Sequence, residues 1–227
     1  MRPGSDGTLR ICTEPRACEN SILKIVSTGI YYALALCAAG AFVFWLAGPW
    51  FAIPMPVLAL FCLYFFRDPD RQIPNGPIAV SPADGKVVAI KPEGGLNRLS
   101  IFLNVFDVHV NRTPIGGAIE KVLYQEGKFL VASREECSRD NEQNIVTVTG
   151  DGTTVIFKQI AGLIARRIVF TKKPGDKVAI GERIGLIKFG SRCDVLFGPE
   201  WEITVQPGQR VSAGSSVIAR RLDRNSQ

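Results

Sequence analysis

The sequence predicts a mostly β domain, a flattened β-sandwich of the barrel-sandwich kind, preceded by an N-terminal hydrophobic helical hairpin. Three observations support this prediction. One segment near the N-terminus is long, apolar and uncharged, the following sequence consists of short apolar runs between Gly, Pro, Asn and Asp, and a Pro-Gly motif occurs twice near the C-terminus. The 227 residues, 46% hydrophobic with a net charge of +6, suffice for one such domain and an additional segment.

The N-terminal part of the chain divides into a basic tail and an apolar segment. Residues 1–24 carry several Arg and Lys side chains, whereas residues 25–66 contain no Asp, Glu, Lys or Arg. Because about 20 apolar residues cross a bilayer, this segment is long enough for two crossings joined at its Gly-Pro step. We therefore expect a helical hairpin over 26–46 and 51–66. The second helix is short, so the sequence leaves open whether the hairpin spans the membrane or only embeds in it.

Basic residues flank both ends of the apolar segment. Lys24 precedes it and Arg67 follows it. The positive-inside rule places both ends in the cytoplasm, which predicts a cell-membrane protein whose β domain faces the cytoplasm. The six cysteines form no Cys-x-x-Cys pair, as expected for reduced thiols in that compartment. A buried hydrophobic hairpin in a soluble core is the alternative interpretation.

From residue 67 onward the chain changes to short β segments separated by turn residues. Helical periodicity is weak, apart from a short turn expected near 161–167. Residues 67–227 therefore form the predicted β domain. The expected strands are 78–80, 86–91, 99–105, 118–126, 145–150, 153–160, 177–180, 184–189, 193–197 and 201–205.

A short repeat lies within this domain. The stretches "KPGDKVAIGERIGLI" and "QPGQRVSAGSSVIAR" share a Pro-Gly turn, at Pro174 and Pro207, followed by a short strand, a second Gly turn and another strand. The pattern resembles the hairpin turns of lipoyl and biotinyl carrier domains. Those carriers present a lysine at a hairpin tip, and this sequence has no such tip, so the likeness concerns architecture alone.

The stretch "RIGLIKFGSRCDV" contains an interruption between two runs that favour strands. Gly190 and Ser191 form a Gly-Ser step there, and a glycine inside a strand weakens its ladder. The ordinary interpretation of such a step is a loop. The functional interpretation is a reactive serine that follows an unhindered glycine carbonyl.

Three further stretches contain polar residues that could carry chemistry. "VSPADGKV" places Asp84 in a turn, and "IFLNVFDVHVNRTPIGG" places the only histidine of the chain, His109, on an alternating strand, followed by Arg112. "KQIAGLIARRIV" adds Arg166 and Arg167. Taken singly, each has an ordinary explanation, such as a turn aspartate, a structural histidine or a solvated arginine pair.

Taken together, these stretches and "FRDPDRQIP" resemble the phosphatidylserine decarboxylase proenzymes of the short type, over about 67–220. Members of this family cut their own chain at Gly-Ser and convert that serine to a pyruvoyl group. The resemblance implies a cut between Gly190 and Ser191, giving a β chain of 1–190 and an α chain of 191–227.

The resemblance also implies roles for the other residues. Ser191 would attack the Gly190 carbonyl and, as pyruvoyl, form a Schiff base with the substrate amine. His109 would move the protons, and Asp84 could hold its ring as in a Ser-His-Asp arrangement. Longer family members carry a second histidine where this chain has Arg112, so one histidine serves both cleavage and reprotonation, or Arg112 takes a charge-stabilising part.

The expected function is the decarboxylation of membrane phosphatidylserine to phosphatidylethanolamine by a carboxy-lyase that needs neither a metal nor pyridoxal phosphate. Arg112, Arg166 and Arg167 are candidate partners of the lipid phosphate or carboxylate. The α and β chains would stay together, and a homodimer is left open. Two alternatives are a non-catalytic, membrane-tethered, lipoyl-like binding module and a decarboxylase of a related serine lipid. Nucleic-acid binding is disfavoured because the basic residues are scattered without interleaved aromatic side chains.

Overall fold

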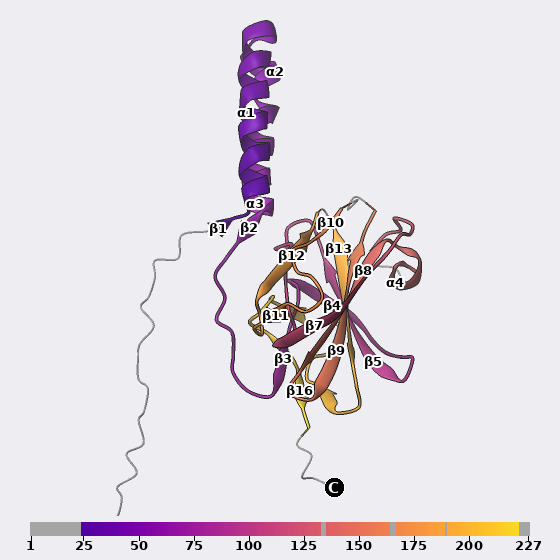
Figure 1. Ribbon diagram of the computed structural model, residues 1–227. Helices are drawn as coiled ribbons and strands as arrows, with labels where there is room; N and C mark the ends of the chain where they lie inside the picture. Colours follow the sequence, from indigo (N-terminus) through magenta and orange to yellow (C-terminus); the bar gives the residue numbers. More distant parts are fainter. Residues whose placement is uncertain (1–23, 133–134, 164–166, 189, 223–227) are drawn as a thin grey trace, which may run out of the picture.

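The computed structural model describes residues 24–132, 135–163, 167–188 and 190–222. A hairpin of apolar helices stands on a mostly β domain, with a separate pair of two-residue strands at the base of the hairpin (Figure 1). The fold class predicted from the sequence is confirmed.

The hairpin consists of three helices, α1 (Ser27–Ala47), α2 (Pro49–Ala52) and α3 (Pro54–Phe65). The first helix ends at Gly48, whose φ of +87° is a conformation that glycine adopts without strain. Proline occupies the first position of α2 and of α3, where its missing N–H costs no hydrogen bond. The chain then returns along α1, and α1 and α3 pack against each other.

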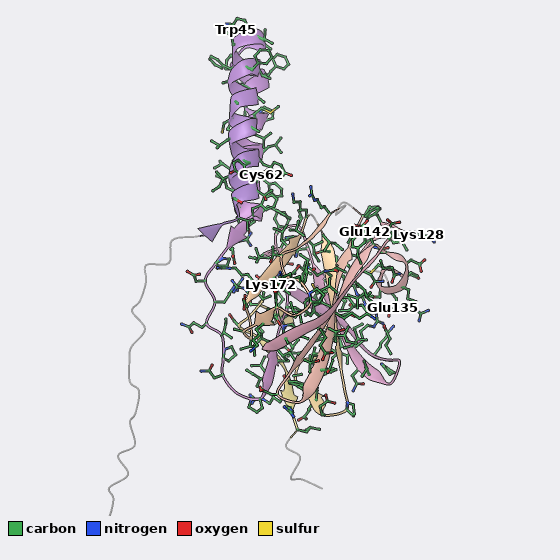
Figure 2. The ribbon with its side chains drawn as sticks, in the orientation of Figure 1. Trp45, Cys62, Lys128, Glu135, Glu142 and Lys172 are labelled. Carbon is green, nitrogen blue, oxygen red and sulfur yellow. The ribbon has the colours of Figure 1, made fainter. Side chains whose placement is uncertain are left out.

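The surface of the hairpin is suited to lipid. A helix of 21 residues is about 31 Å long at 1.5 Å per residue, close to the thickness of a bilayer core. Among the described residues, one helix, α1, is long and apolar enough to cross a membrane. The returning arm, formed by α2 and α3, is shorter. Trp45 and Trp50 are exposed at the tip (Figure 2 labels Trp45), and Tyr31 and Tyr64 are exposed near the β domain. Aromatic residues at both ends are typical of a membrane-embedded segment.

The β domain is built around one curled antiparallel sheet of eight strands. Strand β13 lies in its interior, paired with β9 on one side and β5 on the other. The order across the sheet is β11 (Lys177–Val178), β7 (Gly117–Gln125), β8 (Gln143–Gly150), β9 (Thr153–Ala161), β13 (Ser191–Phe197), β5 (Leu96–Leu103), β4 (Gly85–Glu93) and β15 (Arg210–Val211).

Smaller sheets close the domain. The apolar core lies inside the curl, where alternate residues of β5, β9 and β13 meet side chains of the smaller sheets. The smaller elements are β10 (Ile168–Phe170), β12 (Arg183–Ile187) and β6 (Val110–Arg112) in one sheet, β14 (Trp201–Ile203), β16 (Val217–Arg221) and β3 (Ile78–Val80) in another, the pair β1 (Lys24–Ile25) and β2 (Arg67–Asp68), and the short helix α4 (Cys137–Asp140).

The Pro-Gly repeat found in the sequence is also a repeat of the structure. The copy at Pro174 supplies β11, and the copy at Pro207 supplies β15, at the two opposite edges of the large sheet. Each copy continues into a strand of a small sheet, β12 or β16. Both Pro-Gly turns have glycine φ near +94°, at Gly175 (93°) and Gly208 (95°).

A second pair of motifs, not recognised in the sequence, completes two similar halves. The stretches "SPADGKV" and "TPIGGAI" lead from β3 into β4 and from β6 into β7. They cross each other with matching hydrogen bonds, from Arg112 N to Pro82 O and from Val80 N to Pro114 O, each 2.9 Å. We call β3, β4, β15 and β16 the first half, and β6, β7, β11 and β12 the second half.

The structure corrects three details of the sequence interpretation. Strand β6 begins at Val110, so His109 lies one residue before the strand on which it was expected. The helical turn expected near 161–167 is not formed at Ala161, which ends β9, and residues 164–166 lie outside the described part. The four-residue helix α4 was not anticipated.

Candidate active site

The Gly190-Ser191 step lies where the chain passes from one sheet to another. Strand β12 ends at Ile187 in a three-stranded sheet, and β13 begins at Ser191 inside the eight-stranded sheet. Gly190 has φ of +67°, and a Cβ added there would meet no atom within 4 Å. Glycine is therefore required at this position for its backbone conformation rather than for space.

Ser191 is buried at the first position of β13. Its backbone is paired with Leu103 and with Ala161, and its residue is 0% exposed. Among the described residues, its hydroxyl oxygen has no hydrogen-bond partner. A buried hydroxyl without a partner is costly, on the order of 1–3 kcal/mol, and such groups call for a functional explanation. The arrangement leaves Ser191 Oγ available as a nucleophile.

His109 contacts the same junction. Its Nε2 accepts a hydrogen bond from Gly190 N at 3.2 Å, and its Nδ1 lies 2.8 Å from the carbonyl oxygen of Asp107. These partners assign the proton to Nδ1 and leave the lone pair on Nε2. The pKa of His109 is lowered to about 4, chiefly by burial and in smaller part by the Arg67 charge, while hydrogen bonding and charge from Asp107 oppose the shift. The imidazole is therefore neutral at pH 7 and able to accept a proton.

Gly162 lies against the carbonyl of the same glycine. A Cβ built on Gly162 would lie 2.3 Å from Gly190 O and 3.1 Å from Gly190 C. Only a residue without a side chain lets the end of β9 approach this carbonyl so closely. Sequence reasoning missed this role, although the glycine inside the apolar run "QIAGLI" was its signal.

The opposite face of β13 is anchored by buried charges. Arg192 Nε binds Asp194 Oδ1 at 2.7 Å, and Arg98 and Ser138 bind Asp194 Oδ2 at 3.2 and 2.7 Å. Arg192 also donates to Ser100 Oγ at 2.6 Å. Breaking one partner of such a buried network typically costs about 3–5 kcal/mol. The network therefore fixes the strand that begins at Ser191, and no motif in the sequence indicated it.

Asp84 does not hold the ring of His109 in this structure, because that place is taken by the Asp107 carbonyl. The Asp84 carboxylate instead accepts two hydrogen bonds from Arg71 Nη2, at 3.0 and 2.8 Å, and one from Ala213 N at 2.7 Å. It therefore ties the segment that follows the hairpin to a turn of the first half.

The arginines singled out in the sequence are not gathered at the junction. Arg112 is buried, and its guanidinium binds Asp68 Oδ1 at 2.9 Å and Gly181 O at 3.1 Å. Burial lowers the pKa of Arg112, and the Asp68 carboxylate opposes this shift. Arg167 is exposed, immediately before β10, and Arg166 lies outside the described residues.

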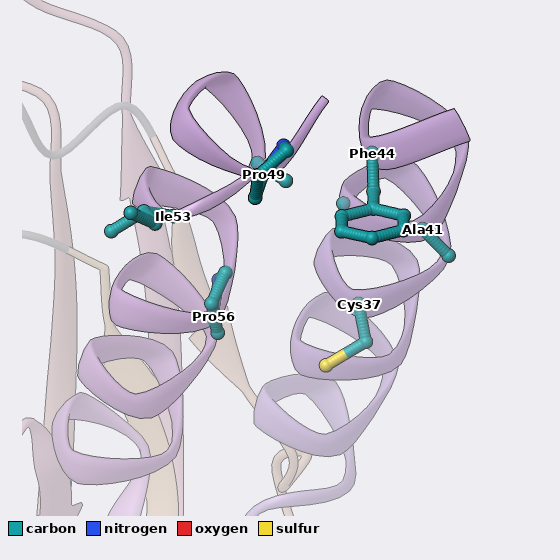
Figure 3. Close-up of a pocket in the computed structure, with 8 residues that line it drawn as sticks. Cys37, Ala41, Phe44, Pro49, Ile53 and Pro56 are labelled. Atoms are coloured by element: carbon teal, nitrogen blue, oxygen red, sulfur yellow. The ribbon is translucent and has the colours of Figure 1, made fainter. Parts of the chain in front are cut away.

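An apolar groove lies in the hairpin, away from the junction (Figure 3). It measures about 430 Å³ between α1 and the returning arm, and its lining is apolar, with Cys37 and Phe44 from α1 and Pro49, Ile53 and Pro56 from the returning arm. Two further pockets border the first half. None of the three includes His109 or Ser191, which agrees with a serine that is closed off from solvent.

A buried serine hydroxyl at a strand junction, the preceding glycine and a neutral imidazole in contact with that glycine make up the candidate site. The model of the phosphatidylserine decarboxylase family matches residues 58–219. The chain belongs to this family and is a decarboxylase. This membership excludes the alternative of a non-catalytic lipoyl-like module.

Curated relatives agree with this assignment. The chain is 86% identical over 204 residues to the phosphatidylserine decarboxylase proenzyme of Solibacter usitatus, covering 90% of this chain and 100% of the relative. It is 45% identical over 213 residues to the protein of that name from Erythrobacter litoralis, covering 85% and 86%. It is 44% identical over 195 residues to that of Cupriavidus taiwanensis, covering 80% and 90%.

Proposed function

We propose that the chain cleaves itself between Gly190 and Ser191 and then decarboxylates phosphatidylserine to phosphatidylethanolamine at the membrane surface. The observation that carries this proposal is the contact of His109 Nε2 with Gly190 N, beside a buried Ser191 hydroxyl without a partner. The names of the relatives, which are proenzymes of that reaction, supply the substrate.

Cleavage begins when Ser191 Oγ attacks the carbonyl carbon of Gly190. The C–N bond breaks as the C–O bond forms, so the amide becomes an ester and the serine proton passes by way of a base to the released amine. Removal of the Ser191 α-proton then expels the Gly190 carboxylate by β-elimination. Water hydrolyses the remaining dehydroalanine to a pyruvoyl group and ammonia. No oxidant or reductant is required.

The chain's own residues prepare this step. Neutral His109 is the base, and it must release the Gly190 N–H to accept the serine proton on Nε2. Gly162 holds the Gly190 carbonyl by close backbone contact. Gly190 has a left-handed φ of +67°, which a residue with a side chain would adopt only with strain.

The residues at the junction fit the pyruvoyl group, because Ser191 is the unpartnered buried hydroxyl from which it would be made. Once formed, the group supplies a ketone that acts as an electron sink for decarboxylation of a bound amine. We expect the reaction to need neither a metal ion nor pyridoxal phosphate. His109 would also return a proton to the product, since it is the sole histidine.

The two chains would remain together after cleavage. Strand β13 starts at Ser191 and keeps its pairs with β5 and β9, and the Arg192–Asp194 network holds its far face. Separation of the freed end at Gly190 would open the way to Ser191, which is closed in the intact chain. Substrate therefore gains access only after processing.

The membrane substrate would approach from the base of the hairpin. Lys188 lies two residues before Gly190 and donates to Tyr32 Oη of α1 at 3.2 Å. Together with exposed Arg167 it supplies positive charge where a lipid phosphate would lie. Arg112, committed to Asp68, is the weaker candidate for this part, and Arg166 remains a candidate from sequence alone. A related serine lipid would meet the same groups.

The test is an intact-mass measurement on the purified full-length protein. We expect a fragment ending at Gly190 and a fragment of 37 residues (227 minus 190) that begins with a pyruvoyl group. Ser191→Ala should remain a single chain without decarboxylase activity, because alanine has no hydroxyl for the acyl shift. An alanine variant that still splits at this bond would show that a separate protease makes the cut.

A further inference from the structure

The hairpin meets the β domain through a small apolar cluster next to the candidate active site. Its members come from α3, from β12 and from the segments around them, so it joins the membrane segment to the second half. We call it the base cluster. It contains the buried residues Phe65, Phe66 and Leu186, with Val26, Phe61, Val105 and Val169 packed against them.

Phe65 of the base cluster also forms a wall of the candidate active site. Its ring lies over the imidazole of His109, with centroids 4.2 Å apart and planes inclined by 32°. Phe65 is 1% exposed and His109 is 2% exposed. The last residue of the hairpin thus covers a face of the histidine that contacts Gly190.

The side-chain hydrogen bonds of His109 involve its two ring nitrogens, with Asp107 O and Gly190 N. These two bonds only weakly restrain rotation of the ring about the line that joins the two nitrogens. An aromatic ring packed against the face supplies the missing restraint, because tilting would lose its contact area. Phe65 therefore fixes the direction of the Nε2 lone pair.

We propose that Phe65 is a positioning residue for His109, so that the β domain has a cleavage-competent site only when the hairpin is seated on it. This inference rests on the proposed self-cleavage at Gly190-Ser191. It makes the membrane hairpin part of the processing machinery as well as an anchor.

The electrostatics of the ring are consistent with this role. Burial is the largest cause of the lowered pKa of His109, and Phe65 contributes to that burial. The charged groups that act on the imidazole are Arg67, at the end of the hairpin, and Asp107, next to the strand. Removing the Phe65 ring admits water, which stabilises the imidazolium and moves the pKa up toward the ordinary value of about 6.5.

The sole histidine makes the inference directly measurable. In the full-length Ser191→Ala precursor in detergent micelles, a ¹³C label at the His109 ring gives one resonance, whose titration reports the pKa near 4. We expect Phe65→Ala to raise this pKa by about 1 unit or more, because the face becomes solvated. Phe61→Ala is the matched control, since Phe61 packs in the base cluster and touches Phe65 rather than His109.

The second measurement is the rate of self-cleavage in the chain with Ser191 intact. Phe65→Ala should slow cleavage by about 10–100-fold, as a misplaced base does, and Phe65→Leu, which refills most of the volume, should recover most of the rate. Phe61→Ala should stay near the parent rate. The inference is overturned if Phe65→Ala leaves titration and cleavage unchanged, or if Phe61→Ala reproduces both effects. A parent chain that never cleaves would overturn the proposed function, while the titration would still test the Phe65–His109 contact.

Discussion

The first and second halves of the β domain share one framework but differ in what they place on it. In the first half, Arg221 N donates to Pro77 O at 2.9 Å, and in the second half, Ile187 N donates to His109 O at 3.3 Å. Pro77 and His109 therefore hold equivalent places, one before β3 and the other before β6. A proline in the first half corresponds to the candidate base in the second.

At a second pair of equivalent positions, the first half carries a charged side chain and the second half carries a glycine. Asp84 in "SPADGKV" corresponds to Gly116 in "TPIGGAI". The Asp84 carboxylate binds Ala213 N, whereas a Cβ on Gly116 would already lie 3.2 Å from Ile180 N. One half uses a side chain to hold its turn, and the other brings the backbone closer instead.

These differences show that the repeated turns build the fold, and that chemistry depends on what each half meets next. The chain leaving β12 runs into Gly190 and β13, beneath the hairpin, whereas the chain leaving β16 runs toward the C-terminus (Figure 1). Among the described residues, only the second half combines a histidine, a link to the Gly190-Ser191 junction and contact with the base cluster.

The largest effect that would test this comparison is expected at His109. His109→Ala should slow self-cleavage by about 10²–10⁴-fold, the usual loss for a general base. Pro77→Ala, the equivalent change in the first half, should stay within about threefold, because Pro77 lies away from the junction. Denaturing gels taken over time measure both rates. Cleavage of His109→Ala at the parent rate would remove histidine from the mechanism.

An intermediate effect is expected at Gly162. Gly162→Ala should slow cleavage by about 10–100-fold, because the new methyl group displaces the Gly190 carbonyl. Gly175→Ala is a control, since it has open space and only a strained φ of +93°. That control should lose about 1 kcal/mol of stability and keep its cleavage rate. Equal cleavage rates for the two variants would mean that the close approach at Gly162 does not position the carbonyl.

The smallest effect on cleavage is expected at Asp84. Asp84→Asn should cleave within about threefold of the parent but lose about 1–3 kcal/mol of stability, because it weakens the charged hydrogen bonds to Arg71 and Ala213. Asp140→Asn, in an exposed ion pair with Lys128, should lose less than about 0.5 kcal/mol. Thermal unfolding compares the two. A cleavage defect at Asp84 as large as that of His109→Ala would restore the role that the sequence suggested.

Local pattern was enough to predict much of the fold. The uncharged segment indicated the hairpin because only lipid or a large core accommodates so long an apolar run. Most strands were predicted within two or three residues, since alternation and turn residues are local signals. The two-residue strands β1 and β2 and the three-residue strand β10 are too short to produce a pattern, and pairing with neighbours defines them.

The candidate site was predictable only in part. Gly190, Ser191 and His109 stand out in the sequence as a Gly-Ser step and a sole histidine, and the structure brings His109 into contact with Gly190, the residue before Ser191. The prediction that Asp84 holds the ring of His109 was based on residue type alone. Residue type does not determine which side chains lie close together in the folded chain. In the structure, the Asp84 carboxylate forms an ion pair with Arg71 instead.

By itself, the sequence determined the apolar hairpin, the repeated turns and the position of the Gly-Ser step, because periodicity, charge and turn chemistry are properties of neighbouring residues. The tertiary structure alone decided that Phe65 covers His109 and that Gly162 meets the Gly190 carbonyl. It also decided that the charges of Arg192 and Asp194 are buried with Arg98. The contacts Gly162–Gly190, Phe65–His109 and Arg98–Asp194 join residues 28, 44 and 96 positions apart, and only the packing of a hairpin on a curled sheet brings such residues together.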